Sequence, residues 1–577
     1  MKRVGWAGMG LFFGLVIYIV LLQTLPSSST VDTILLGVVA LVGAHHAFWK
    51  PRVGGALFLG GTLLLLGLPF VVLPYLNGVG ALGTALIWWG GWGLRRSMGK
   101  VSSVRGWALF GGVASLVGVL LWRLQGSLPP FAFPLHWHNQ SAALLLTTLP
   151  SLFVFGVSRK GVRSLLGWGG MGALLISIVL SGSRAVLALA LLGLFFLPWV
   201  WVGDGGLRGF KKKGWVLGGL FLLFSFFLLS PRFQDLVGGF SSSSRMAYGK
   251  GAILLGASQP LSGVGWGEFT ARYPAVQESV IYSASDPHSW VLRAWAEGGI
   301  WGLLFGGAIL LSFARSAQKA GTGTKEERAL LVGAGLLLLH AFVDFDATFL
   351  PLPFVFGALW GGSDPLPSAT KGEKTKGKGA ALVAVLVVAL WGYRQIPPQD
   401  CSAGDQVGCA QSYLARGTSW LGSTEDLRNA LEPRLIPVAE GVADHLLTVG
   451  GDSPLAQRTA TLIARTDAEK ARRLWERAIQ WDPHNFPETY LALAQLEWSL
   501  FQDRERALSW VDRALSLEEW GKLRQPEEVF SFRLDARSRE LDQVLGRLWL
   551  LKGVLTPEDN QEKDKALERS NQLLGED

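Results

Sequence analysis

The sequence predicts an all-α protein, in which a polytopic transmembrane helical bundle of about 12–13 spans precedes a helical domain outside the bilayer. Hydrophobic residues make up 49% of the 577 residues and charged residues only 17%, which is few for a soluble chain. The apolar residues gather in blocks of about 20, the length at which a helix crosses a bilayer. Residues 1–397 carry 31 Lys and Arg against 13 Asp and Glu, whereas residues 398–577 carry 22 against 31. A basic membrane part and an acidic soluble part are therefore expected.

Thirteen apolar blocks are the candidate spans. They lie at 5–25, 31–49, 53–74, 76–94, 106–122, 139–157, 164–181, 185–202, 214–230, 289–314, 329–346, 348–362 and 380–397. The weakest are 329–346 and 348–362, because they are short. The first block follows Lys2 and Arg3 without a small-residue cleavage site, so we expect a retained helix rather than a signal peptide.

The orientation follows from the Lys and Arg clusters, which favour the cytoplasmic side. With the N-terminus inside, nearly every cluster falls on one face, including KPR at 50–52 and the lysine run at 211–213. These charges sit in short loops where they orient helices, so nucleic acid is not an expected partner. The predicted parts are N-terminal transmembrane helices at 1–230, a large extracytoplasmic loop at 231–288, C-terminal transmembrane helices at 289–397 and an extracytoplasmic helical domain at 398–577.

Both cysteines, Cys401 and Cys409, lie in the last of these parts. Their spacing permits a small disulfide loop, which an oxidising compartment outside the cytoplasmic membrane would maintain. Two free thiols are the alternative.

The last part also contains an internal repeat. AEKARRLWERAIQWDP at 468–483 realigns with RERALSWVDRALSLEE at 504–519 at an offset of 36 residues. The pattern of small and large residues, followed by Asp482-Pro483, resembles a tetratricopeptide repeat (TPR), whose period is about 34. We therefore expect a TPR-like domain that binds a partner protein, with an ordinary helical bundle as the alternative.

Ionisable residues in or beside spans usually face a cavity and are functional candidates. The topology places nearly all of the following at one face: Arg184, Arg232, Arg245, Lys250, Arg272, His288, Arg293, Glu297, His340, Asp344 and Asp346. Structural alternatives exist, because Arg293 and Glu297 are spaced i, i+4 and can pair on one helix. His288 precedes a span and can be an exposed or capping residue, and Arg184 can extend to the interface. No third ligand lies near His136 and His138, so no metal is expected.

A cluster of Arg residues with one His suits transfer from a lipid diphosphate to an alcohol. Guanidinium groups bind phosphate oxygens in pairs and stabilise the charge of a departing diphosphate. A neutral His takes a proton from a hydroxyl near neutral pH. Neither step needs a metal or another cofactor.

The ordered segments LSGSRAVLALALLGLFF, SRMAYGKGA, PLSGVGWGEF, DPHSWVLRAWAEGGIWGLL and HAFVDFDATFLPLPFVFGALWG resemble the O-antigen ligase and O-antigen polymerase superfamily of bacterial envelope glycosyltransferases. The repeat domain and the extra span at 380–397 resemble the subset with C-terminal TPRs. The resemblance implies a multi-pass enzyme of the bacterial cytoplasmic membrane that transfers a glycan from undecaprenyl diphosphate, with inversion and without a metal or cofactor. The acceptor stays open between another lipid-linked glycan, lipid A core and a protein such as a pilin.

Carried over by motif, the resemblance assigns Arg184 and Arg245 to the donor diphosphate, with Arg272 as a further phosphate contact. His288 would contact or deprotonate the acceptor hydroxyl, and Glu297 would act beside it. Arg293 and Asp344 would support the site.

Two other classes of function fit the sequence less well. A transporter or flippase would hold polar groups near the bilayer midplane, often between inverted repeats, whereas these residues gather at one face and the two halves show no clear repeat. A scaffold anchored by its spans would need far fewer than thirteen. A protein O-oligosaccharyltransferase is a variant of the glycosyltransferase hypothesis.

Overall fold

The computed structural model describes residues 100–124, 132–133, 138–202, 240–278, 282, 284, 286–346, 351–363, 436–449, 453–517, 532–558 and 560–575. Within these ranges all regular structure is helical, as predicted. The chain divides into two compact units. The first unit comprises 1–72, 78–242 and 287–396, and the second comprises 73–77, 243–286 and 397–577.

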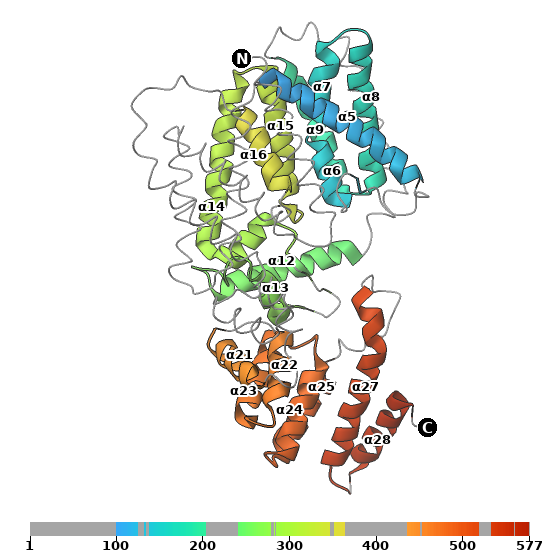
Figure 1. Ribbon diagram of the computed structural model, residues 1–577, viewed down its shortest axis with the longest axis vertical. Coiled ribbons are helices and arrows are strands. Elements are labelled where there is room, and N and C mark those ends of the chain that lie inside the picture. The colour runs from blue at the N-terminus through green and yellow to red at the C-terminus, as the bar shows by residue number, and fades with distance from the viewer. Residues whose placement is uncertain are drawn as a thin grey trace. The chain divides into compact units, whose positions relative to one another are not determined.

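The first unit contains the membrane helices (Figure 1). Its described helices are α5 (Lys100–Leu124), α6 (His138–Leu146), α7 (Leu149–Ser158), α8 (Val162–Ser181), α9 (Arg184–Val202), α14 (Trp290–Gly321), α15 (Lys325–His340) and α16 (Pro351–Ser363). Helix α5 packs across α7 and α8, and α15 packs against α7, α9 and α16. Leu144, Leu149 and Leu174 are fully buried between them, whereas Leu116 and Leu120 on α5 are exposed, as expected for a helix with a lipid-facing side.

Five helical segments among the described residues are long and apolar enough to cross a membrane. They are Val104–Leu124, His138–Ser158, Val162–Ser181, Arg184–Trp201 and Trp290–Gly321. These segments confirm the apolar blocks predicted from about residue 106 to 202 and from 289. The weak blocks at 329–346 and 348–362 correspond to the shorter helices α15 and α16. The predicted spans at 5–25, 31–49, 53–74, 76–94, 214–230 and 380–397 lie outside the described residues.

Helix α14 is broken at Gly299, so the predicted block at 289–314 is not one continuous helix. Gly299 has φ 55° and ψ −141°, a conformation that residues with a Cβ avoid. A methyl group on Gly302 would overlap the carbonyl oxygen of Ala294, and one on Gly306 would lie 2.6 Å from the ring of Trp290. Such pairs would be about 12 and 24 Å apart along a straight helix. The segment 290–298 therefore folds back onto the start of the long helix, and it carries Arg293 and Glu297 with it.

The break at Gly299 gives a direct test of this fold. Gly299→Ala should destabilise the protein by about 1–3 kcal/mol, because alanine is strained at this φ and ψ. Gly307→Ala is the matched control, because nothing lies within 4 Å of a Cβ at that position on the same helix. Thermal unfolding in detergent, followed by size-exclusion chromatography, compares the two variants. Equal melting of Gly299→Ala and the wild type would contradict the fold-back.

The second unit combines part of the predicted loop with the C-terminal helices. The segment predicted as a loop at 231–288 is partly helical, because it contains α12 (Phe240–Ser258), α13 (Phe269–Arg272) and the 3-10 helix η1 (Tyr273–Val276). Residues of α12 from Ser243 onward belong to this unit. The C-terminal helices are α21 (Ile436–Val449), α22 (Ser453–Ile463), α23 (Ala468–Trp481), α24 (Pro487–Ser499), α25 (Arg504–Leu515), α27 (Phe532–Leu555) and α28 (Gln561–Leu574) (Figure 1).

The internal repeat recurs in the helices themselves. Helices α23 and α25 begin at equivalent positions, and Asp467 and Asp503 cap them by accepting from the backbone N–H of Lys470 and Arg506. The repeat's aligned alanines, Ala471 with Ala507 and Ala478 with Ala514, are all fully buried. Helix α22 packs on α23, and α24 packs on α25. Membership of the TPR family stays a prediction, and Cys401 and Cys409 lie outside the described residues.

Candidate active site

His288 lies at the junction between the folded-back segment and the loop before it. It precedes Ser289, which caps α14, and its φ of 54° is in the left-handed region. The backbone N–H of Trp290 donates to the carbonyl of Ala341, directly after α15, at 3.0 Å. Non-glycine residues held at positive φ often mark functional positions, since the surrounding contacts must offset the strain. The imidazole is therefore fixed between the start of α14 and the end of α15.

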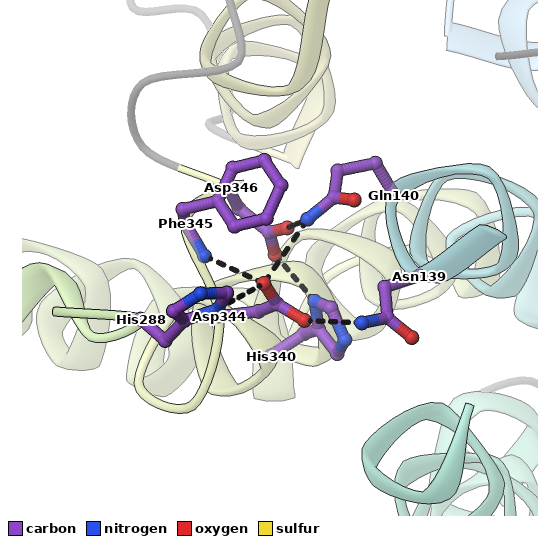
Figure 2. A network of polar contacts seen from close by, with 7 residues as sticks. All are labelled: Asn139, Gln140, His288, His340, Asp344, Phe345 and Asp346. Atoms are coloured by element: carbon purple, nitrogen blue, oxygen red, sulfur yellow. Dashed lines mark hydrogen bonds and ion pairs between the residues drawn. The ribbon is translucent and has the colours of Figure 1, made fainter. Parts of the chain in front are cut away.

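The side chain of His288 meets a buried carboxylate. Its Nδ1 lies 3.2 Å from Oδ1 of Asp344 (Figure 2), and the two side chains are 25% and 1% exposed. Oδ1 of Asp344 also accepts from the backbone N–H of Phe345 at 2.9 Å and from Nε2 of Gln140 at 3.2 Å. Nδ2 of Asn139 donates to Oδ2 at 2.9 Å. These donors compensate for the burial of the charged group.

A second His–Asp pair lies behind the first (Figure 2). Nδ1 of His340 is 2.6 Å from Oδ2 of Asp346, and both side chains are buried. The amide of Gln140, which donates to Asp344, also lies 3.5 Å from Oδ1 of Asp346. One amide thus lies between the two carboxylates. The ring of Phe345 meets the imidazole of His288 edge to face, with centroids 5.2 Å apart.

Asn139 and Gln140 are functional candidates that the sequence reasoning missed. They stand at the start of α6, about 200 positions before the carboxylates that they contact. The sequence feature that indicates them is HNQ at 138–140, where two side-chain amides stand at the start of an apolar block. Polar groups at the end of a span need partners, but the sequence does not name those partners.

Arg293 and Glu297 form the ion pair that their i, i+4 spacing suggested. Nε of Arg293 lies 3.0 Å from Oε2 of Glu297, and the carboxylate is 2% exposed. The structure therefore contains the ion pair that is the structural alternative to a catalytic role for these two residues. A catalytic role for Glu297 stays a prediction.

Arg184 stands at the junction of two membrane helices, as the sequence suggested. Gly182 ends α8 in the left-handed conformation, with its N–H donating to the carbonyl of Val179. The N–H of Ser183 donates to Oγ of Ser181 at 3.2 Å, and α9 begins at Arg184. Arg184 is half-buried, at the helix end where unsatisfied N–H groups favour anions.

The other two arginines of the predicted site belong to the second unit. Arg245 is on α12, and Arg272 is the last residue of α13. Both are half-buried, and Nε of Arg272 lies 4.0 Å from Oε2 of the buried Glu268. The structure therefore brings His288 and Asp344 together in the first unit, whereas Arg245 and Arg272 share the second. Among the described residues, no group of three or more His, Cys, Asp or Glu is arranged to hold a metal ion.

Predicted site residues from both units fall within one stretch of the sequence. Residues 169–306 match the family described as O-antigen ligase. The chain carries an O-antigen ligase domain. The match begins in α8 and ends beyond the break in α14, so it contains Arg184, Arg245, Arg272, His288 and Glu297. No curated protein matches the chain.

The O-antigen ligase domain confirms the superfamily predicted from sequence. Together with the five candidate spans, it indicates a membrane glycosyltransferase of the bacterial inner membrane. The domain also implies a lipid-linked glycan as donor and a glycan or lipid as acceptor. Asp344 and its partners Asn139 and Gln140 lie outside the matched residues, and their contacts with one another and with His288 place them beside it in the candidate site.

Proposed function

We propose that this O-antigen ligase-type enzyme transfers an undecaprenyl-diphosphate-linked glycan to an acceptor hydroxyl at the extracytoplasmic face, with inversion and without a metal. The observation that carries the proposal is the pairing of a partly exposed His288 with a buried Asp344 that accepts several hydrogen bonds. This arrangement is that of a general base whose orientation is fixed by a carboxylate.

The contact between His288 and Asp344 supports a scheme for the proton transfer. In this scheme the Nδ1–H of His288 donates to Oδ1 of Asp344, and Nε2 is the basic nitrogen. Nε2 takes the proton of the acceptor hydroxyl while its oxygen attacks the anomeric carbon of the donor. The bond from that carbon to the diphosphate oxygen breaks, and the diphosphate leaves with the bonding electrons. Attack from the face opposite the leaving group inverts the anomeric configuration.

The arginines stabilise the leaving group in this scheme. Arg184, Arg245 and Arg272 neutralise the charge that grows on the diphosphate as the bond breaks. Arginine suits this task because it remains protonated and its donors match phosphate oxygens in pairs.

The contacts within the second unit support the predicted sidedness. Nδ2 of Asn485 donates to Oε1 of Gln277 at 3.2 Å, so no membrane separates the loop segment from the C-terminal helices. The chain must cross the bilayer an even number of times between them, and the sequence predicts four crossings. Both segments then lie on the face opposite the lysine run at 211–213.

The arginines provide the test of donor binding. Arg184→Ala and Arg245→Ala should each lower kcat/KM for a synthetic undecaprenyl-diphosphate-linked glycan by about 10- to 100-fold, because each removes charged hydrogen bonds to phosphate. Arg315→Ala is the control, since this exposed arginine lies at the opposite, predicted cytoplasmic end of α14. The assay uses detergent-solubilised enzyme, so a flippase would form no product. Wild-type kinetics in both variants would reject the proposal.

The acceptor is identified by comparing cells with and without the gene. Loss of a polymerase leaves short chains that are still attached to their acceptor. Loss of a ligase leaves long chains that are not attached to an acceptor. Loss of a protein oligosaccharyltransferase removes the glycan from a protein and leaves lipid A core unchanged.

A further inference from the structure

The second unit contains a junction between the arginine-bearing segment and the C-terminal helices. Helix η1 lies against α23, and Gln277, directly after η1, accepts the hydrogen bond from Asn485. Gln277 is only 4% exposed. A buried side-chain amide that loses its partner is destabilising, so this contact fixes how the two segments meet.

The turn after α23 holds Asn485 rigidly. Asp482 ends α23, and its Oδ1 accepts from the backbone N–H groups of His484 and Asn485 and from Nδ2 of Asn485, the last at 2.9 Å. The carboxylate is nearly buried. The same Nδ2 thus contacts Asp482 on its own side and Gln277 on the other. The C-terminal helices therefore present a preformed amide to the loop segment.

Aromatic packing connects η1 to α12. The fully buried Tyr273 of η1 stacks on Phe269, with centroids 5.1 Å apart, and meets Tyr248 of α12 edge to face at 6.0 Å. Its hydroxyl donates to the carbonyl of Tyr282 at 2.9 Å. A Cβ on Gly251 of α12 would lie 2.5 Å from the Tyr273 ring, so the helix approaches too closely for any side chain there. These contacts fix η1 against α12.

The two arginines sit on the elements joined in this way. Arg272 directly precedes Tyr273, and Arg245 lies three residues before Tyr248 on α12. A displacement of η1 would move the backbone of Arg272 with it and shift the packing under Arg245. The path from the C-terminal helices to both arginines is therefore a continuous set of packed side chains, not a flexible tether.

We propose that Gln277 and Asn485 are positioning residues, through which the C-terminal helices hold Arg245 and Arg272 in the arrangement that binds the donor diphosphate. This inference rests on the proposed role of the two arginines. It gives the C-terminal helices a part in the transfer reaction besides contact with a partner.

The test is a double-mutant cycle in the full-length enzyme. Gln277→Met removes the acceptor at similar length, and Asn485→Ala removes the donor. Each change should raise KM for the lipid-linked donor by roughly 2- to 10-fold, the effect of one hydrogen bond, while kcat stays near the wild-type value. The double variant should be no worse than the more affected single variant, since both break the same contact. Arg569→Ala is the control, because it removes an exposed hydrogen bond to Gln572 on α28.

Three results would overturn the inference: an unchanged donor KM in Gln277→Met, a fall in kcat without a change in KM, or additive effects in the cycle. Arg245→Ala distinguishes this failure from failure of the proposed function. If Arg245→Ala raises KM and Gln277→Met does not, the positioning role alone is wrong. If Arg245→Ala also leaves both KM and kcat/KM unchanged, the diphosphate assignment is wrong.

Discussion

His288→Gly is expected to lower the rate of glycan transfer by about 100- to 10,000-fold, the contribution of a general base. Glycine is the suitable replacement because it adopts the φ of 54° found at His288 without strain. Asp344 keeps its contacts with Asn139, Gln140 and the N–H of Phe345 in this variant. The folded protein should therefore persist, and the loss should appear in kcat at saturating donor and acceptor.

Added imidazole separates a chemical role from a structural one. The glycine variant leaves a space next to Asp344, in which free imidazole can donate the same hydrogen bond to the carboxylate and restore part of the rate. His288→Asn is the matched control, since asparagine also tolerates positive φ but occupies part of that space. We expect recovery in the glycine variant and little in the asparagine variant. A His288→Gly enzyme with wild-type turnover would remove the base from the mechanism.

Apolar periodicity was sufficient to predict the membrane helices but not the shape of one of them. The blocks near 106–122, 164–181 and 185–202 match described helices within a few residues. The block at 289–314 is apolar on both sides of Gly299 apart from a few residues such as Arg293 and Glu297, so its composition does not show that the backbone reverses there. The pair Gly298-Gly299 permits the break, since adjacent glycines mark a position where the chain can leave the helix. The pair alone does not predict it, because Gly306-Gly307 in the same block stays helical.

The candidate site was predictable as far as it is local in sequence. His288 and Asp344 stood out as ionisable residues next to spans, and the structure places them in contact. Asn139 and Gln140 did not, because neutral amides near a span carry little signal until their partner is known. The contact between Gln277 and Asn485 joins residues 208 positions apart. Sequence periodicity reports on one element at a time and does not contain such pairings.

Asp344→Asn is expected to lower kcat by about 100-fold or more, because the carboxylate sets the tautomer and orientation of His288. The asparagine amide can turn its NH₂ group toward Nδ1 of His288, which then becomes the acceptor and leaves Nε2 protonated. In that orientation the NH₂ group also faces the N–H of Phe345 and Nε2 of Gln140, which donate to the same position. An NH₂ group turned the other way faces Nδ2 of Asn139, which also donates. Either orientation leaves a donor opposite a donor.

Asp346→Asn is the matched control for this change. It makes the same substitution two residues later in the same connection, where the carboxylate meets the fully buried His340 instead of the partly exposed His288. We expect a much smaller fall in kcat for Asp346→Asn than for Asp344→Asn. The His288→Gly and Asp344→Asn pair should be far from additive, since Asp344 acts through the imidazole. Additive losses would mean that Asp344 contributes independently of His288.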